Sequence, residues 1–176
     1  MNDRKLTLQG EGYFEVTHSE ELPFEIITRE VRLRVVGTKF NFKNYPDDEE
    51  VIVNLLEGKV ALRNEIKPRP ELYMEPDEKV IIDKRTGEMR KTRTDARHVN
   101  AWTRDELFFD EELLEDIAKK LMRIYDVKIE IADSLRNRRF YGNFKLMGSS
   151  IDEVLQTIAS TKRMKYRYEN GKYILY

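Results

Sequence analysis

The sequence has 176 residues, of which 40% are hydrophobic and 37% charged, and its 32 basic and 33 acidic residues leave a formal net charge of −1. The absence of cysteine excludes disulfides and thiolate metal sites, and no apolar stretch is long enough to cross a bilayer. The balanced charge gives no general attraction to nucleic acid or to an anionic membrane, and the length suits one mid-sized domain or two small ones.

The first part of the chain, from Leu6 to about Ile82, is typical of a protein built from short strands. Residues 31–35 alternate apolar and charged side chains with a period of two, which predicts a half-buried strand. Further strands are predicted where aromatic and branched residues cluster between turn signals, at 13–16, 24–27, 39–42, 51–53 and 60–62. No convincing helix lies among them, so these strands favour a β-sandwich or a related β-roll.

Residues 84–100 break this pattern because they contain little apolar sequence. They include the basic residues Arg85, Arg90, Lys91, Arg93 and Arg97. Glu88 and Asp95 dilute this positive charge, and no aromatic residue is interleaved for base stacking. We therefore expect an exposed connector, with one short strand near Met89, rather than a phosphate-binding segment.

Beyond the connector the apolar spacing becomes that of helices. Asp110 is the expected cap of a first helix, with Glu111 and Glu112 in its first turn, where the helix dipole favours negative charge. A second helix is expected to open with a capping box, in which Ser150 and Glu153 satisfy each other's backbone N–H groups. The apolar face of the first helix would be Leu114, Ile117, Leu121 and Ile124, and that of the second Ile151, Val154, Leu155 and Ile158.

These two helices belong to blocks that align without a gap when the sequence is shifted by 37 residues, so that Leu114 matches Ile151. Strands are expected before and after each helix, at 107–109, 127–131, 141–146 and 164–168. The second half of the chain is therefore predicted to be a duplicated β-α-β unit. Each copy has one apolar helix face and one apolar strand face, so each needs the other to close a core.

The C-terminal tail predicts a β-hairpin, because Asn170-Gly171 suits the central positions of a type I′ turn, where both residues need a positive φ. The resulting register pairs Tyr168 with Tyr173, keeps Tyr166 on the same face and leaves Tyr176 on the other. These four tyrosines are the candidate partner-binding residues. Core packing against the helices is an equally good interpretation of most of them, and it explains Tyr176 least.

Residues that catalysis or metal binding would need are missing. His18 and His98 are far apart in the sequence, whereas a metal site takes three or four clustered ligands. No serine lies in a nucleophile elbow, and no phosphate loop or dinucleotide fingerprint occurs. Adjacent acidic residues are expected by chance among 33 acidic residues. The sequence therefore predicts a protein that is not an enzyme, with no catalytic, metal or cofactor site.

Four strings in order resemble the FecR domain, the periplasmic module of anti-sigma regulators. They are residues 8–16 (LQGEGYFEV), Pro23-Phe24 with the strand that follows, residues 36–42 (VGTKFNF) and residues 55–60 (LLEGKV). Residues 101–176 are similar to the small C-terminal domain that follows FecR domains in Bacteroidetes-type proteins. That domain resembles the signalling domain of secretins and TonB-dependent transducers, which is itself a paired β-α-β unit, in agreement with the internal repeat.

Together, the predicted elements and the resemblance indicate an α+β fold of two domains. An all-β FecR-like domain would occupy residues 1–98, with the connector at 84–100, and a signalling-like β-α-β repeat with a terminal hairpin would occupy 101–176. The resemblance implies the periplasmic, signal-receiving part of a transmembrane anti-sigma regulator. Its partner would be the signalling domain of a TonB-dependent outer-membrane transporter. A sigma factor would bind a cytoplasmic segment that is missing here, as is the membrane helix.

Two departures from the family pattern affect these expectations. The Pro-Gly-Glu turn of the family reads Pro76-Asp77-Glu78, which indicates a different turn. The chain also begins near the third or fourth strand of a FecR domain. A β-domain without its first strands is expected to expose a sheet edge, and we expect partner binding or self-association along it.

Two other classes of protein stay open. One is an envelope module that binds carbohydrate or serves as a scaffold, although the single tryptophan argues against exposed aromatic platforms for sugars. The other is an RNA-binding protein, because a β-α-β repeat with strand tyrosines is similar to RNA-binding sheets. The sequence lacks both the RNP1-like string and the Gly-x-x-Gly loop that such proteins use, so binding to nucleic acid is not expected.

Overall fold

The computed structural model describes residues 4–146, 148–161 and 163–176. Most of its regular structure is strand, and its longer helices lie toward the C-terminal end, so the predicted α+β class is confirmed. The chain divides into two compact units between Asn100 and Ala101. Each unit has a hydrophobic core of its own.

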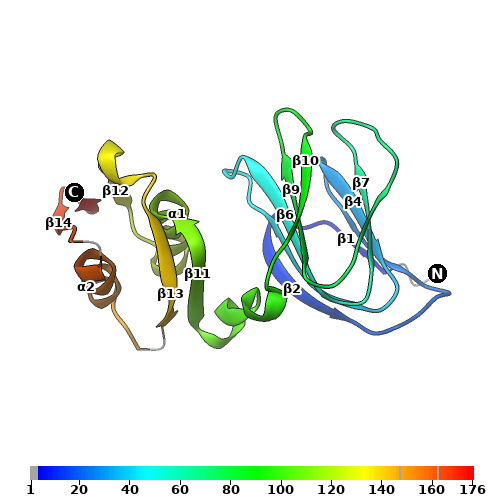
Figure 1. The fold of residues 1–176 in the computed structure, drawn as a ribbon, viewed down its shortest axis with the longest axis horizontal. Helices are drawn as coiled ribbons and strands as arrows, with labels where there is room; N and C mark the ends of the chain where they lie inside the picture. The colour runs from blue at the N-terminus through cyan, green and yellow to red at the C-terminus, as the bar shows by residue number, and fades with distance from the viewer. Residues whose placement is uncertain (1–3, 147, 162) are drawn as a thin grey trace. The chain divides into compact units, whose positions relative to one another are not determined.

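The first unit is a sandwich of two five-stranded sheets (Figure 1). One sheet has the order β1-β3-β4-β7-β8, with bounds Lys5–Leu6, Phe24–Ile27, Val31–Val35, Val60–Asn64 and Leu72–Met74. The other has the order β10-β9-β6-β5-β2, with bounds Met89–Arg93, Glu78–Asp83, Glu50–Glu57, Thr38–Asn44 and Gly10–Val16. The core is shared by apolar side chains of both sheets, as the short alternating strands predicted.

Strand β4 shows how the sequence pattern produces this core. Its apolar residues, Val31, Leu33 and Val35, are buried, while the arginines between them are exposed. Across the core, Phe40 of β5 is fully buried, and its ring stacks on Phe14 of β2 at a centroid distance of 5.1 Å and an interplanar angle of 17°. Because side chains alternate across a strand, a period of two places one row of residues in the core and the other in water.

The predicted connector at 84–100 contains the strand that was expected near Met89, and this strand extends further along the chain than expected. Met89–Arg93 form β10, which pairs antiparallel with β9 at the outer side of the second sheet. Only Met89 packs against the core, and the remaining residues of β10 are exposed. An outermost strand can be held by the hydrogen bonds of one neighbour and needs few apolar side chains, so composition alone did not reveal its full length. A short 3-10 helix, Ala96–His98, follows.

The turn at Pro76-Asp77-Glu78 has aspartate at the position where the family's turn has glycine. Asp77 has a φ of 62°, and the Glu78 N–H donates to the Glu75 carbonyl at 3.2 Å, as in a type II turn with proline at its second position. The Asp77 N–H donates to the carbonyl of Leu55 at 3.0 Å. The neighbouring backbone therefore holds a non-glycine residue in a left-handed conformation that glycine would adopt at lower cost.

Strand β2 is an outermost strand of its sheet, in the domain where the sequence predicted an exposed edge. Strand β2 pairs with β5 from Gly10↔Asn44 to Val16↔Thr38. In the part of the chain that the structure describes, no strand pairs with the other side of β2. A seven-residue strand at the end of a sheet leaves alternate backbone groups without a partner strand, which is the usual starting point for partner binding or self-association.

The second unit contains two strand–helix–strand segments and a final strand. Its elements are β11 (Glu106–Leu113), α1 (Leu114–Tyr125), β12 (Ile129–Ile131), β13 (Arg139–Lys145), α2 (Ile151–Thr161), β14 (Tyr166–Glu169) and β15 (Lys172–Leu175). Short 3-10 helices lie at Ala101–Arg104 and Asp133–Leu135. Strands β11 and β13 pair with each other, and β15 lies between β12 and β14 in a three-stranded sheet. The two helices begin 37 residues apart, as the repeat predicted.

The prediction that Asp110 caps the first helix is wrong. Strand β11 continues to Leu113, and a bulge between Phe109 and Glu112, where Glu111 has a φ of 53°, keeps it paired with β13. Helix α1 begins only at Leu114, and no side chain caps it. The pairing with β13 decided this boundary, and a pattern of acidic residues could not show it.

The predicted face of α1 is correct except at its end. Leu114, Ile117 and Leu121 are buried, whereas Ile124 is 45% exposed and Tyr125 packs against the core instead. A helical face can advance by three or four residues at each turn, and here the last step is four.

Helix α2 has the capping box that its sequence predicted. The Glu153 carboxylate accepts from the Ser150 N–H at 2.7 Å, and the Ser150 hydroxyl accepts from the Glu153 N–H at 3.3 Å. Val154, Leu155 and Ile158 are buried, and Ile151 packs against the same core. The helix therefore begins at a fixed residue, which places its first turn against the C-terminal hairpin.

Candidate partner-binding hairpin

The hairpin β14–β15 has the turn and register that its sequence predicted. Asn170 and Gly171 have φ values of 53° and 78°, as a type I′ turn requires. Tyr168 lies opposite Tyr173, and Tyr166 lies opposite Leu175. The hairpin thus sets the position of every candidate tyrosine.

Two of the four tyrosines hold the hairpin to helix α2. The Tyr173 hydroxyl donates to one carboxylate oxygen of Asp152 at 3.0 Å, and the Tyr166 hydroxyl lies 3.3 Å from the other. Tyr173 is only 8% exposed. Burial, followed by the hydrogen bond and charge of Asp152, raises the pKa of the Tyr173 phenol, and burial with the same carboxylate raises the pKa of Tyr166. Both side chains therefore have a structural role.

The other two tyrosines are exposed to solvent. Tyr168 is 64% exposed, although one side of its ring lies 4.9 Å from the ring of Tyr173. Tyr176 is 47% exposed and lies under the guanidinium of Arg167, whose carbon is 5.1 Å from the ring centroid. As the register predicted, the two exposed rings lie on opposite faces of the hairpin.

The outer edge of β14 exposes the backbone of Tyr166 and Tyr168. The N–H and carbonyl groups of Lys165 and Tyr176 bond to each other at 2.9 and 3.0 Å. Residues alternate between the two sides of an antiparallel strand, so the backbone groups of Tyr166 and Tyr168 point away from β15. In the described residues, no further strand pairs with β14 on that side. An exposed aromatic ring thus lies beside an unpaired strand edge.

Asp152 is the residue of this site that sequence reasoning missed. Asp152-Glu153 opens α2 as acidic pairs often do, so the sequence indicates no role for Asp152 beyond a helix start. Its contact with two phenols depends on how the hairpin packs against the helix, which no local pattern reveals. No sequence motif predicts this contact from the spacing of Asp152, Tyr166 and Tyr173.

Replacing this acceptor is expected to loosen the hairpin. Asp152→Asn removes one of two carboxylate acceptors, and we expect the free energy of unfolding to fall by about 1 kcal/mol. It also removes a negative charge, so the pKa of Tyr173 should fall. Urea unfolding followed by circular dichroism, and NMR titration of the Tyr173 ring, would measure the two effects.

The internal repeat supplies a control for this variant. Glu115 occupies the position in α1 that Asp152 occupies in α2, and its partner is Arg136 at 3.6 Å rather than a phenol. Glu115→Gln should therefore leave the Tyr173 titration unchanged. An equal fall in the Tyr173 pKa in both variants would contradict the assignment of Asp152 as the phenol acceptor.

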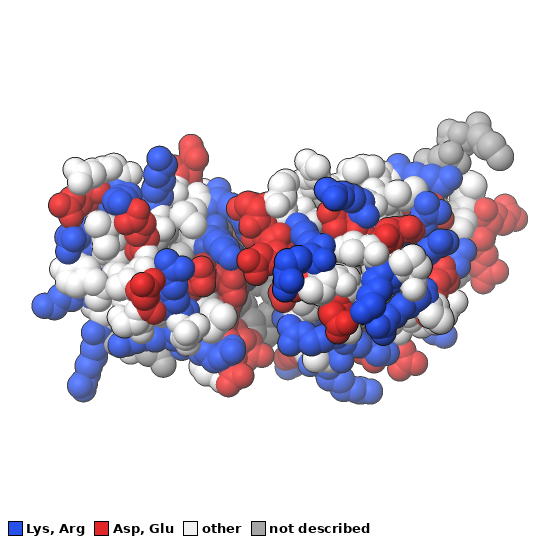
Figure 2. Space-filling view, turned by 90° about the horizontal axis from the view of Figure 1, so that it is seen from above, with Lys and Arg blue, Asp and Glu red and all other residues white. Residues whose placement is uncertain are grey.

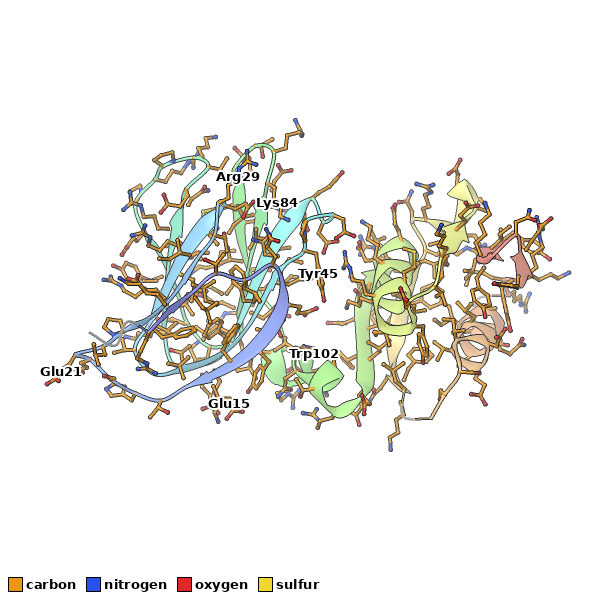
Figure 3. All side chains as sticks on the ribbon, turned by 180° about the vertical axis from the view of Figure 1, so that it is seen from behind. Glu15, Glu21, Arg29, Tyr45, Lys84 and Trp102 are labelled. Atoms are coloured by element: carbon orange, nitrogen blue, oxygen red, sulfur yellow. The ribbon has the colours of Figure 1, made fainter. Side chains whose placement is uncertain are left out.

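A hollow in the first unit is a less suitable site. It has a volume of about 800 Å³ and lies where turns and strand ends meet at one end of the sandwich, and Arg29 and Lys84 line it (Figure 3). Burial alone would raise the pKa of Glu30 in this hollow, but hydrogen bonds involving Asn44 and Thr28 outweigh it and hold that pKa below its usual value. Among the described residues that line the hollow there is no aromatic ring, so it offers no platform for a sugar.

The surface carries both signs of charge. Basic and acidic side chains are interspersed over the face shown in Figure 2. Within residues 4–146, 148–161 and 163–176, no group of histidine and acidic side chains could hold a metal ion. Over the same residues, none of the helices has the length and apolar character to span a membrane.

Comparison with protein families assigns both parts of the chain. Residues 2–61 match the family described as FecR protein, and residues 106–176 match the family described as FecR, C-terminal. The two matches do not overlap and together cover most of the sequence. A search of curated proteins finds no match.

Solved structures agree with this assignment. Two crystal structures of a putative anti-sigma factor from Parabacteroides distasonis ATCC 8503, at 1.65 and 2.50 Å resolution, have TM-scores of 0.86 and 0.84. Each is 29% identical in sequence, and the match covers 98% of this chain and 79% of the other. The fold and the matches define a signalling regulator. The chain belongs to the FecR family of anti-sigma regulators.

Proposed function

We propose that this chain is the signal-receiving part of an anti-sigma regulator and that it receives its signal by protein–protein contact at the hairpin β14–β15. The observation that carries the proposal is the unpaired outer edge of β14, where Tyr168 is 64% exposed. An edge strand can pair with a partner strand through its backbone, and an exposed tyrosine adds a large contact area at low cost in side-chain entropy. This function needs no catalytic group.

The partner that fits the family is the periplasmic signalling domain of a TonB-dependent outer-membrane transporter. We infer that residues 1–98 and 101–176 are separate domains of the periplasmic part, and that a sigma factor is controlled through a cytoplasmic segment of the regulator. The match of residues 106–176 to the FecR C-terminal family supports placing the receiving surface in the second unit. A transporter and a sigma factor encoded beside this protein would identify both partners.

The Tyr168 side chain is expected to be required for signalling but not for folding. Tyr168→Ser, introduced into the regulator in cells, should lower signal-dependent transcription from the sigma factor's promoter by about tenfold or more, because exposed tyrosines often dominate the energy of an interface. A promoter–reporter fusion, measured with and without the transporter's substrate, provides the result.

Tyr73→Ser is the control, because Tyr73 is a similarly exposed tyrosine, at 62%, in strand β8 of the first unit. Signal-dependent transcription from the sigma factor's promoter should be the same with this variant as with the unmodified protein. Normal induction in Tyr168→Ser, with the regulator present at its usual level, would contradict a contact at the hairpin. Equal losses in both variants would show that the effect does not depend on this surface.

A further inference from the structure

A second docking surface lies at the opposite edge of the same three-stranded sheet. Strand β12 borders a groove of about 250 Å³ whose other side is helix α1. Its floor is apolar and consists of Ala118, Met122, Ile129 and Ile131. Its rim carries both signs of charge and consists of Glu115, Lys119, Glu130 and Arg136. This β12–α1 groove is distinct from the hairpin edge, because β15 separates β12 from β14.

The backbone of β12 directs hydrogen-bonding groups toward the outside of the sheet. On its inner side, the Lys128 carbonyl accepts from the Tyr173 N–H at 2.9 Å, and the Ala132 N–H donates to the Leu175 carbonyl at 3.0 Å. Alternate residues of a strand address the same neighbour, so the N–H and carbonyl groups of Ile129 and Ile131 point the other way. Among the described residues, no strand pairs with that side of β12.

We propose that the β12–α1 groove binds an extended segment of a partner protein, which adds to the sheet as a strand beside β12. The backbone groups of Ile129 and Ile131 would supply the hydrogen bonds. Side chains on one face of the added strand would lie on the apolar floor formed with Ala118 and Met122. A strand edge beside a helix suits an extended peptide, because the backbone provides affinity and the groove selects alternate side chains.

The charge of β12 restricts what the added strand can be. Ile129 and Ile131 pack toward the core, so Glu130 between them lies on the opposite, exposed face. Lys172 bonds to only one oxygen of the Glu130 carboxylate. An added strand with the order apolar, basic, apolar would place its apolar residues on the groove floor and its basic residue beside Glu130.

The same charge argues against a second copy of this chain as the occupant. In the two-fold antiparallel pair that uses both outward-facing residues of β12 in each copy, Ile129 of one copy would bond to Ile131 of the other. The two Glu130 side chains would then lie directly opposite each other, and like charges in that position destabilise a strand pair. Full use of this strand edge therefore favours a different protein, with a basic residue at the central position.

A peptide can test the groove on the complete chain. The probe is a short, end-blocked peptide of alternating valine and lysine, added to the isotope-labelled protein and followed by NMR. We expect saturable shifts of the Ala118, Ile129 and Ile131 amides, and none with the same peptide methylated at every backbone nitrogen, which cannot donate hydrogen bonds. Shifts that do not saturate, shifts confined to β14, or equal binding of the methylated peptide would overturn the proposal.

A pair of variants on α1 provides a second readout. Met122→Lys places a cation on the groove floor and should weaken binding of the valine–lysine peptide by about tenfold. Ile124→Lys adds the same charge to the same helix at a residue that is 45% exposed and does not line the groove, so it should bind the peptide like the unmodified protein. Equal effects of the two variants would overturn the proposal. If Met122→Lys fails to fold, the comparison of the two peptides on the unmodified protein still decides.

Discussion

Phe40→Ala is expected to lower the free energy of unfolding of the first unit by about 3–5 kcal/mol. The side chain is fully buried, and its strand β5 pairs with β2 on one side and β6 on the other. Its ring also stacks on Phe14. Truncation would remove buried apolar area and leave a cavity between two sheets that cannot easily collapse. Urea unfolding followed by circular dichroism would measure the loss, and hydrogen exchange of the β5 amides would assign it to the first unit.

The control for this variant is Tyr73→Ala, which truncates an aromatic side chain of the same unit that is 62% exposed. Its free energy of unfolding should stay within about 0.5 kcal/mol of the original value. A loss below about 1 kcal/mol in Phe40→Ala would contradict the placement of Phe40 between the sheets.

Gly58→Ala should be almost as damaging, because two effects combine at this turn between β6 and β7. Gly58 has a φ of 88°, which residues with a Cβ atom rarely adopt. A Cβ atom would also lie 2.4 Å from the Gly37 carbonyl oxygen and 2.8 Å from the Thr38 hydroxyl. Both contacts are far inside van der Waals distance, and one is to backbone. We expect the free energy of unfolding to fall by about 3 kcal/mol or more.

Gly171→Ala separates the cost of backbone strain at a positive φ from the cost of a steric clash of the added Cβ atom. Gly171 has a similar φ, 78°, but nothing lies within 4 Å of an added Cβ atom. Its substitution should therefore cost only the conformational term, about 1–2 kcal/mol. Urea unfolding of both variants gives the difference. Equal losses would mean that the strands around Gly58 shift without cost, contrary to the close packing of this turn.

Features set by neighbouring residues could be predicted from the sequence. The alternation of residues 31–35 predicted strand β4, Asn170-Gly171 predicted the hairpin, and Ser150 with Glu153 predicted the start of α2. The shift of 37 residues predicted that a second helix repeats the first. In each of these cases a short stretch of backbone and its own side chains decide the structure.

Features set by distant pairing could not be predicted. Strand β11 runs past Asp110 because β13 pairs with it, and β10 continues from Met89 to Arg93 because β9 offers its outer side. The insertion of β15 between β12 and β14 likewise brings together strands from different parts of the sequence. Such pairings depend on long-range contacts that local periodicity does not contain.

The candidate site shows the same division. The hairpin register correctly predicted which tyrosines share a face, because a two-residue turn fixes the pairing. The face of the hairpin that is covered depends on helix α2. The contact of Asp152 with the two phenols likewise depends on how the helix packs against the hairpin. That contact separates Tyr166 and Tyr173, which hold the unit together, from Tyr168 and Tyr176, which are exposed.

The most direct test of the receiving role is a titration of the isotope-labelled chain with the isolated signalling domain of the TonB-dependent transporter that we propose as its partner. The account predicts saturable binding at micromolar concentration, with the strongest NMR shifts along β14 and at Tyr168. The absence of binding at that concentration, with both proteins folded, would contradict it, and so would binding whose shifts lie only in the first unit.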